Sequence, residues 1–328
     1  MAESLLFTAA GLERAVRALL EQSGSRPDEA RLVAENLVEA NLTGHDSHGV
    51  GMLLRYVDAL LEGALLANQR ASVELDTGVL VRLDGHHGYG QVVGREAMAL
   101  GSERARVHGV CVVALGNAHH LGRIGHFAEQ CLASGLVSIH FVNVVARPIV
   151  APWGGREARY GTNPVCIGIP RDEGEPVVVD FATSRIAQGK TRIAYNKGLL
   201  LAPGTILDDR GEPSVDPRYT VVPPYGALLP LGEHKGYGLA LAAELLAGAL
   251  TGGDTCRPEN LSQRRIGNGM LSILIEPARL GTLSHFFAES QAFLDWVRSA
   301  QSVDLAQPVA LPGEPERSER RRRQERGI

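Results

Sequence analysis

The stretch Gly116-Asn117-Ala118-His119-His120-Leu121-Gly122-Arg123-Ile124-Gly125 places two histidines and an arginine between an apolar run and a helical pattern. The preceding residues, 107–115, are apolar and β-branched, and the following apolar residues recur at helical spacing. The histidines are therefore predicted to lie in a strand-to-helix turn. Backbone N–H groups in such a turn can bind an anion, and a histidine can transfer a proton there at neutral pH. This pattern favours an enzyme; two histidines that bond carbonyls in an ordinary turn are the alternative.

Composition is that of an ordinary globular protein. The chain has 328 residues, of which 44% are hydrophobic and 21% charged, enough for about two domains with substantial cores. Its net charge of −4 gives no electrostatic reason to expect nucleic acid as a partner.

The sequence carries no pattern of export or of a membrane span. Residues 1–10 lack a basic segment followed by an apolar core, and no run approaches the roughly 18 apolar residues of a membrane helix. A cytoplasmic protein without a membrane partner is therefore expected. The cysteines are far apart and form no Cys-x-x-Cys pair, so we expect buried free thiols rather than zinc or disulfides. They are Cys111, Cys131, Cys166 and Cys256.

Periodicity predicts helices first, and then strands mixed with helices in an α/β core. Helices are expected at 8–23, with Thr8 as N-cap, and after Pro27. Strand patterns follow at 71–75, 79–83, 107–115, 137–145, 176–180 and 271–275, and helical patterns at 91–107, 124–134, 236–250 and 284–300. From residue 315 the chain is polar, and the four arginines at 320–323 favour a solvated helical or frayed tail over an anion-binding role.

The segment Gly88-Tyr89-Gly90-Gln91-Val92-Val93-Gly94 is similar to the glycine fingerprint of a dinucleotide fold. However, the next strand ends in Gly116-Asn117 rather than in an acid that could bind ribose. The glycines are therefore expected to serve a sharp bend after Asp84-Gly85. A better ribose ligand is Asp180, which ends the strand 176–180 and would repel the extra phosphate of NADP. Capping of the following turn is the alternative role for Asp180.

Several further motifs follow one another along the chain. They are Gly44-His45-Asp46-Ser47-His48-Gly49 with Tyr56, Tyr160-Gly161-Thr162-Asn163-Pro164, Asp180-Phe181-Ala182-Thr183-Ser184, Glu233-His234-Lys235-Gly236-Tyr237-Gly238 and Leu311-Pro312-Gly313-Glu314. Together with the histidine turn, they resemble the type-2 malate/L-lactate dehydrogenase family. The resemblance runs from about the first helix to residue 314.

The resemblance implies an α/β fold that is not Rossmann, with a mixed-sheet cofactor domain and a helical domain built from both chain ends. The expected boundaries are 1–70 plus 284–314 for the helical domain, 71–283 for the NAD-binding and catalytic domain, and 315–328 for the polar tail. It also implies a homodimer that interconverts 2-hydroxy and 2-oxo carboxylates with NAD, or alternatively NADP. A catalytically silent protein of the same fold, which binds a dinucleotide or metabolite, is the alternative function.

The resemblance also implies site residues. His120 matches the family's catalytic histidine, and Ser47 and His48 match its Ser-His-Gly beside nicotinamide and substrate. Lys235 could neutralise pyrophosphate or polarise an oxygen, and a solvated lysine is the alternative. The expected cofactor-binding residues are His48, Gly122, Val178, Val179, Asp180, Thr183, Ser184, His234, Leu311, Pro312, Gly313 and Glu314.

One position departs from the family pattern. Many members carry an arginine four residues after the histidine of Ser-His-Gly, where it can hold the substrate carboxylate, whereas this chain has Met52. Because a thioether cannot pair with a carboxylate, Arg123 is expected to replace it as a catalytic-site residue. Arg55 and Arg147 are the alternatives, and a surface arginine is the other role for Arg123.

Two other chemistries are disfavoured by the pattern. Four histidines could supply nitrogen ligands, but no H-E-x-x-H motif or cysteine ligand accompanies them, so no metal is expected. They are His45, His48, His119 and His120. The G-x-S-x-G elbow of a serine hydrolase does not occur in the sequence.

Overall fold

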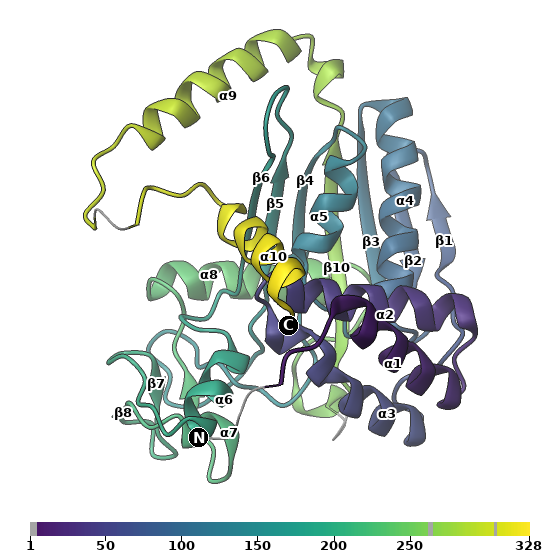
Figure 1. The fold of residues 1–328 in the computed structure, drawn as a ribbon. Helices are drawn as coiled ribbons and strands as arrows, with labels where there is room; N and C mark the ends of the chain where they lie inside the picture. The colour runs from purple at the N-terminus through teal and green to yellow at the C-terminus, as the bar shows by residue number, and fades with distance from the viewer. Residues whose placement is uncertain (1–4, 262–264, 305–306) are drawn as a thin grey trace.

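The computed structural model describes residues 5–261, 265–304 and 307–328, and it opens with three helices (Figure 1). They are α1 (Ala9–Gln22), α2 (Pro27–Leu42) and α3 (Leu53–Leu61), of which α3 was not predicted. α1 begins as predicted, because the Thr8 hydroxyl accepts a hydrogen bond from Gly11 N. The three apolar stripes pack together around Leu20, Leu37 and Tyr56. Residues 1–4 of the expected helical domain lie outside the described residues.

A seven-stranded mixed sheet forms the centre of the molecule (Figure 1). Its strands, in the order in which they pair, are β1 (Ser72–Asp76), β2 (Leu80–Asp84), β3 (Val110–His119), β10 (Gly267–Ile275), β4 (Val137–Val142), β5 (Val165–Ile169) and β6 (Val177–Phe181). Among these described strands only β2 and β3 pair in parallel. A Rossmann sheet is built of parallel strands, so the expected mixed sheet that is not Rossmann is confirmed.

Helix α4 (Gly90–His108) connects β2 to β3. Apolar residues of α4 and of α5 (Gly125–Leu132) form one hydrophobic core with the strands of this sheet. The glycines at 88–94 serve this packing. A Cβ at Gly90 would lie 2.4 Å from His119 O, and a Cβ at Gly94 would lie 2.7 Å from the Phe127 ring. The segment is therefore not a dinucleotide fingerprint, and Gly90 brings α4 directly against the backbone of the histidine turn.

The strand before the histidines begins and ends later than predicted. α4 continues to His108 and is closed by Gly109, which has the left-handed φ of 88° that favours glycine. β3 then runs to His119, because His119 pairs with Gly267 on β10. The turn that leads to α5 therefore begins at His120.

A second, three-stranded sheet was not predicted. It consists of β7 (Ile206–Leu207), β8 (Pro213–Ser214) and β9 (Ala227–Leu228), paired in the order β8-β7-β9. Together with α6 (Gln188–Asn196) and α7 (Arg218–Val221), it forms the lower left part of the molecule in Figure 1. Two-residue strands are too short to show the alternation by which a strand is recognised in sequence.

The chain end is arranged differently from the expectation. α8 (His234–Ala243) continues into a π-helical turn, Glu244–Ala249. α9 (Leu283–Arg298) has no buried residue and lies in Figure 1 above the upper ends of β4–β6, away from α1–α3. It therefore does not join residues 1–70 in a helical domain.

Residues 315–328 are largely helical, one of the two expected forms of the tail, but the helix is packed against the fold instead of being free in solvent. α10 (Glu314–Arg326) contacts α2, and Arg320 and Arg323 form ion pairs with Glu39 and Asp46. The arginine run was misread because its partners are distant in sequence, on α2 and in the turn that follows it. Of the helices near the C-terminus, α10 is thus the one that packs against an N-terminal helix, α2.

The cysteines are free and buried, as expected. Burial raises the pKa of the Cys131 thiol to about 11, so it stays protonated at neutral pH. In the described part of the chain, no helix is both long and apolar enough to cross a membrane.

His140 is a buried histidine of the central sheet. Its side chain is fully buried on β4, and Nδ1 lies 2.8 Å from Ser272 Oγ on the neighbouring β10. Burial lowers its pKa to about 3. Because an unfolded histidine titrates near pH 6.5, the unfolded chain takes up the proton first as the pH falls. The contribution of neutral His140 to stability is therefore present above about pH 6.5 and is lost as the pH falls toward 3.

We expect His140→Asn to weaken the acid dependence of stability. The free energy of unfolding of the wild type should decrease as the pH is lowered from about 6. In the variant, this pH dependence should be weaker by about 1.4 kcal/mol per pH unit. Urea unfolding at several pH values between about 6 and 4 measures it. The matched control is His285→Asn, because His285 is exposed on α9. Equal slopes in the wild type and His140→Asn would contradict the assignment.

Candidate active site

The turn that carries Ser47 and His48 is held by the end of α2. Asp46–His48 form a 3₁₀ turn, and a second one follows at Val50–Met52. Asn41 donates from Nδ2 to Asp46 Oδ1 (2.6 Å) and accepts at Oδ1 from Val50 N (2.8 Å). This buried amide therefore connects both 3₁₀ turns. Within the first of them, Ser47 Oγ lies 3.0 Å from His48 Nδ1.

His120 follows β3, and α3 supplies its hydrogen-bond partner. Tyr56 Oη lies 2.7 Å from His120 Nδ1, and Gln91 Nε2 donates to the same Tyr56 Oη at 2.8 Å. Burial raises the pKa of Tyr56, which is therefore a neutral phenol. Among the described residues, no hydrogen bond engages His120 Nε2. The ring is thus oriented through Nδ1.

The rings of His48 and His120 are stacked, with centroids 5.6 Å apart and planes inclined by 10°. Burial lowers the pKa of His48 to about 4. Burial likewise lowers the pKa of His120 well below its ordinary value, and the neighbouring His48 adds to this shift. Both imidazoles are therefore neutral at pH 7, the form in which a histidine can accept a proton.

Helix α6 closes the other side of Ser47. A Cβ at Gly189 would lie 2.0 Å from Ser47 Cβ, so only glycine permits this approach. Arg192 lies three residues further along α6, on the same side of the helix as Gly189.

Arg55 is near enough to Arg147 and Arg192 for their charges to act on it, and these three residues are called the arginine cluster. Burial lowers the pKa of Arg55, and the charges of Arg192 and Arg147 lower it further. The charge of Arg55 also contributes to the lowered pKa of His120. The Arg147 guanidinium stacks 3.8 Å above the centroid of the Tyr225 ring. Mutual repulsion among these cations favours the binding of an anion.

Arg123 does not belong to this cluster. Its side chain is 2% exposed, and Nη2 and Nη1 bind the two carboxylate oxygens of Glu129 at 2.5 and 3.2 Å. Glu129 lies on the helix that begins two residues after Arg123, so α5 itself supplies the partner. This geometry contradicts the expectation that Arg123 replaces the arginine missing at Met52.

Asp180 on β6 binds the start of α5. Its Oδ2 accepts a hydrogen bond from Gly125 N at 2.7 Å. A carboxylate at a helix N-terminus is stabilising, so Asp180 has a structural role, although at α5 rather than in the turn that follows it. Burial raises the pKa of Asp180, and the charge of Arg123 opposes this effect.

The expected cofactor-binding segments 178–180 and 311–314 lie side by side. Val178 N donates to Pro312 O at 3.2 Å, and a Cβ at Gly313 would lie 3.3 Å from Val178 Cβ. Since β6 is the last strand of the sheet, this contact lies along its outer edge.

Three other expected cofactor residues are engaged within the protein. The buried Thr183 hydroxyl lies 3.0 Å from Thr162 O, to which it donates, and Ser184 Oγ donates to Ile186 O at 2.9 Å. Gly122 has a left-handed φ of 81°, and a Cβ there would lie 2.9 Å from Asn36 Oδ1. The hydroxyls of Thr183 and Ser184 are thus bonded to backbone oxygens, and Gly122 is closely packed against Asn36.

His234 and Lys235 are exposed at the start of α8. In the part of the chain that the structure describes, no hydrogen bond or ion pair connects them to His48 or His120. Gly236 serves a tight turn, because a Cβ there would lie 2.1 Å from Leu231 O.

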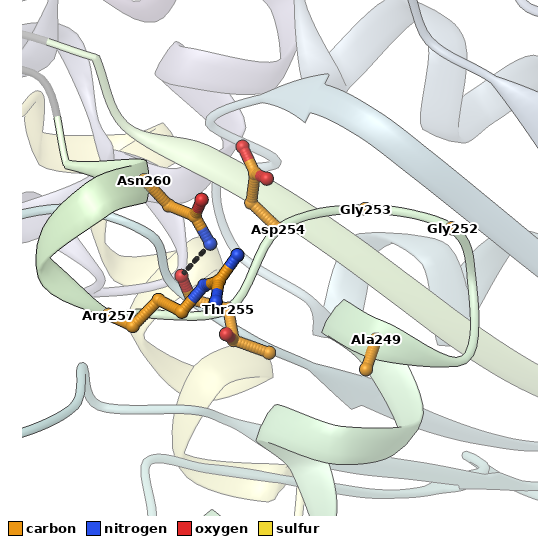
Figure 2. A pocket seen from close by; sticks show the side chains of 7 residues that line it. All are labelled: Ala249, Gly252, Gly253, Asp254, Thr255, Arg257 and Asn260. Carbon is orange, nitrogen blue, oxygen red and sulfur yellow. Dashed lines mark hydrogen bonds between the residues drawn. The ribbon is translucent and has the colours of Figure 1, made fainter.

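A shallow pocket opens elsewhere, on the loop after the π-helical turn (Figure 2). It is lined by Ala249, Gly252, Gly253, Asp254, Thr255, Arg257 and Asn260. Asn260 Nδ2 donates to Thr255 O at 3.0 Å within it, and no expected site residue lines it. Across residues 5–261, 265–304 and 307–328, no group of three or more His, Cys, Asp and Glu side chains is placed to hold a metal ion.

Sequence reasoning missed Gln91, Gly189 and Arg192. Gln91 lies inside the glycine segment that was assigned to a bend, although it opens the helix packed against the histidine turn. Gly189 and Arg192 belong to α6, for which no helix was predicted. Their separation by three residues was the available signal, because it places them on one face of any helix there.

Comparison with known proteins places these features in a family. The model of the malate/L-lactate dehydrogenase family matches residues 7–328. Hydroxycarboxylate dehydrogenase B of Escherichia coli O157:H7 is 48% identical over 324 residues, which cover 98% of this chain and 89% of that protein. L-lactate dehydrogenase of Cupriavidus necator is 42% identical over 295 residues, which cover 89% of this chain and 84% of that protein.

The similarity extends to three-dimensional structure. A solved structure from E. coli, 47% identical in sequence, superposes with a TM-score of 0.96 and covers 99% of this chain and 91% of that chain. The resemblance and the fold expected from the sequence motifs are thereby confirmed.

Proposed function

The chain belongs to the malate/L-lactate dehydrogenase family, and from this we propose that it is an NAD-dependent oxidoreductase that interconverts 2-hydroxy and 2-oxo carboxylates. The relatives described above are named for hydroxycarboxylate and L-lactate. The observation that carries the proposal is His120, which Tyr56 orients and which stacks on His48 near the arginine cluster.

His120 is the proposed acid and base. In the oxidative direction, the neutral ring takes the substrate hydroxyl proton at Nε2, and in the reductive direction it returns that proton to the carbonyl oxygen. Bound NAD supplies the acceptor of the hydride that leaves C2, and NADH supplies the donor in reverse. Because burial keeps His120 neutral, its ring is in the form suited to remove a proton.

Tyr56 and Gln91 support this proton transfer. A ring that uses Nε2 as the base carries its proton on Nδ1, which then donates to Tyr56 Oη. The Tyr56 hydroxyl must in turn donate to an acceptor. Gln91 can present one, because its Oε1 is buried without a partner among the described residues and a half-turn of the amide brings it to Tyr56. We infer that Gln91 and Tyr56 select the reactive tautomer of His120.

The arginine cluster is the proposed site for the substrate carboxylate. Met52 cannot pair with a carboxylate. Arg55 lies about one helical turn further along, and its charge contributes to the lowered pKa of His120. A bound carboxylate would relieve the repulsion that Arg55 experiences from Arg147 and Arg192. Helix α3 would then supply both Arg55, which binds the carboxylate, and Tyr56, which orients His120 toward the reacting oxygen.

The residues present fit a dinucleotide. Asp180 offers a carboxylate at a strand end, and the backbone of 311–314 runs along the outer edge of the same strand at Val178. His48 stacks on His120, and the charge of Arg123 acts on both His48 and Asp180. We propose that 178–180, 311–314 and His48 hold NAD.

We expect Asp180 to disfavour NADP because its carboxylate would face the 2′-phosphate. In Asp180→Ser, the ratio of kcat/KM for NADH to that for NADPH should fall by about tenfold or more. The matched control is Asp84→Ser, since Asp84 ends a different strand, β2. Thermal unfolding separates this effect from the loss of the Gly125 hydrogen bond. Equal kcat/KM values of the wild type for both cofactors would contradict the assignment.

A homodimer is the proposed assembly. Leu241 and Leu245 are exposed in α8 and the turn that follows it, and Phe293 and Trp296 are exposed on α9. A second copy could cover such apolar side chains. Sedimentation should give twice the chain mass of 35.1 kDa, and a monomer would contradict the proposal.

We also propose a cytoplasmic location, because the buried free thiols fit a reducing compartment. Recovery of the protein in an exported or membrane fraction of its source cells would contradict this.

The function is tested with purified protein, NADH or NADPH, and a panel of 2-oxo acids that includes monocarboxylates and dicarboxylates. Oxidation of NADH that depends on one of these acids, with formation of the matching 2-hydroxy acid, is expected. The competing function is a silent binding protein. NADH binding without turnover of any acid would favour that competitor.

A further inference from the structure

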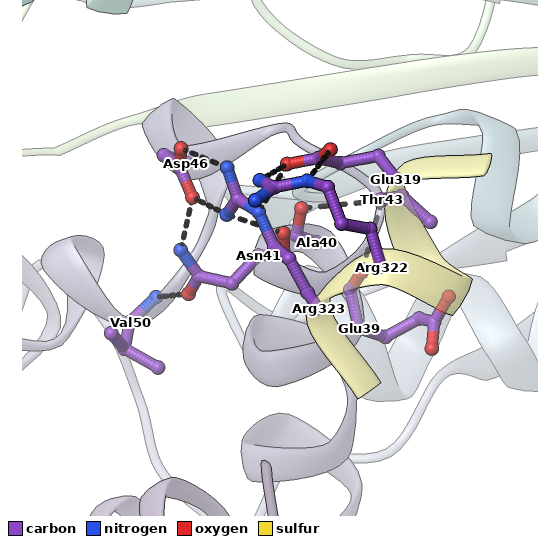
Figure 3. Close-up of polar contacts among 9 residues, drawn as sticks. All are labelled: Glu39, Ala40, Asn41, Thr43, Asp46, Val50, Glu319, Arg322 and Arg323. Atoms are coloured by element: carbon purple, nitrogen blue, oxygen red, sulfur yellow. Dashed lines mark hydrogen bonds and ion pairs between the residues drawn. The ribbon is translucent and has the colours of Figure 1, made fainter. Parts of the chain in front are cut away.

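Helix α10 presents two of its four consecutive arginines to the protein. Arg320 and Arg323 are three residues apart and therefore lie on one face of the helix, where they meet Glu39 and Asp46. Arg321 is exposed, and Arg322 pairs with Glu319 of the same helix. The arginine run is thus divided into a solvent side and a side that contacts the fold. Figure 3 shows two of these arginines, Arg322 and Arg323, with their partners Glu319 and Asp46.

Arg323 holds the turn that carries Ser47 and His48. Its guanidinium donates to Asp46 Oδ1 (2.5 Å), to Asp46 Oδ2 (3.0 Å) and to Asn41 O (2.7 Å). Figure 3 shows that the Asn41 amide links the same carboxylate to Val50. Because the contact with Asp46 is bidentate, it fixes the orientation of the carboxylate as well as balancing its charge.

This ion pair is partly withdrawn from solvent. The Arg323 side chain is 16% exposed, and that of Asp46 is 39% exposed. Burial alone would raise the pKa of Asp46, but hydrogen bonds from Arg323 and Asn41 lower it below its ordinary value. The Asp46 carboxylate therefore stays ionised in spite of its burial, and the pair is less exposed to solvent than the surface ion pairs that contribute little.

The same face of α10 also reaches the other side of the site. Arg320 Nη2 lies 3.5 Å from Glu129 Oε2. Glu129 is also the partner of Arg123, and the charge of Arg123 acts on Asp180. His45, directly before Asp46, lies 3.6 Å from Glu316. One short helix thus contacts both the catalytic turn and Glu129 of α5.

We propose that Arg323 is a positioning residue, which holds Ser47 and His48 in place through Asp46, and that α10 is an integral part of the active site. The kinetic consequence of this proposal rests on the proposed function, whereas its structural consequence does not. Both are therefore measured.

Hydrogen exchange tests the structural consequence. In Arg323→Met, the amides of His48 and Val50 should exchange at least about tenfold faster than in the wild type, while those of α1 are unchanged. Arg321→Met, on the solvent side of the same helix, should leave all of these rates unchanged. Arg323→Lys keeps the charge without the bidentate contact and should lie in between.

Kinetics test the consequence for the reaction. Arg323→Met should lower kcat about tenfold or more, because a small displacement of groups around the reacting atoms is costly. Asp46→Asn should lower kcat similarly, and adding it to Arg323→Met should cause little further loss, since both act through one contact.

The outcomes separate the two proposals. A lowered Tm of Arg323→Met, with unchanged exchange at 45–52 and unchanged kcat for the folded fraction, would show that α10 serves stability alone and would overturn the proposal. If the wild type turns over no 2-oxo acid, the proposed function fails while the exchange rates still decide the role of Arg323. If Arg323→Met does not fold, the comparison is made between Arg323→Lys and Arg321→Lys.

Discussion

Replacing His120 by alanine is expected to lower kcat by about 10²- to 10⁴-fold, while the Kd of NADH changes by less than about threefold. The substitution removes the proposed acid and base but leaves Ser47, His48 and the proposed cofactor segments in place. Steady-state kinetics with the best 2-oxo acid and a fluorescence titration with NADH measure the two quantities.

His108→Ala is the matched control for His120→Ala. His108 is an exposed histidine at the end of α4, so its loss should leave kcat unchanged. Thermal unfolding of both variants accounts for any loss of folded protein. Near-wild-type turnover by folded His120→Ala would remove His120 from the chemistry.

Replacing Arg55 by methionine is expected to raise KM for 2-oxo acids at least tenfold, since a hydrogen bond to a charged group contributes about 1.5–3 kcal/mol. Arg55 is the member of the arginine cluster whose charge acts on His120. The KM of NADH should change little, because the proposed cofactor segments are on β6 and at residues 311–314. Initial rates at varied 2-oxo acid and fixed saturating NADH provide the measurement.

Arg14→Met, an exposed substitution on α1, is the control for the loss of a positive charge. Its KM for the 2-oxo acid should equal that of the wild type. An unchanged KM in Arg55→Met for every acid tested would exclude Arg55 as the carboxylate ligand and leave Arg192 or backbone N–H groups for that role.

The parts of the fold that sequence predicted are those with a local signal. The helical spacing before residue 23 and the cap at Thr8 gave α1, and the apolar run before His119 indicated β3. The order of the family motifs predicted a mixed sheet that is not Rossmann. It also drew attention to His48 and His120, which the fold brings into a stacked pair.

The parts that failed depend on contacts that the spacing of charges does not reveal. Glu129 is only six residues from Arg123, but the sequence does not show that its carboxylate binds the Arg123 guanidinium. Nor does it show that the charge of Arg55 acts on His120. The arginines of α10 look like a solvated tail until Asp46 and Glu39 are placed opposite them. Charge patterns alone do not reveal such pairs, because their partners come from a helix that lies far away in sequence.

The most direct test of the account is transfer of the hydride itself. Purified protein is incubated with NADH that carries deuterium at the transferable position of the nicotinamide and with an unlabelled 2-oxo acid, and the product is analysed by mass spectrometry. We predict a 2-hydroxy acid with one deuterium on C2, formed by the wild type and not by His120→Ala at a comparable rate. A product without deuterium, or no product from any acid of the panel, would contradict the proposal that this protein reduces 2-oxo acids by hydride transfer.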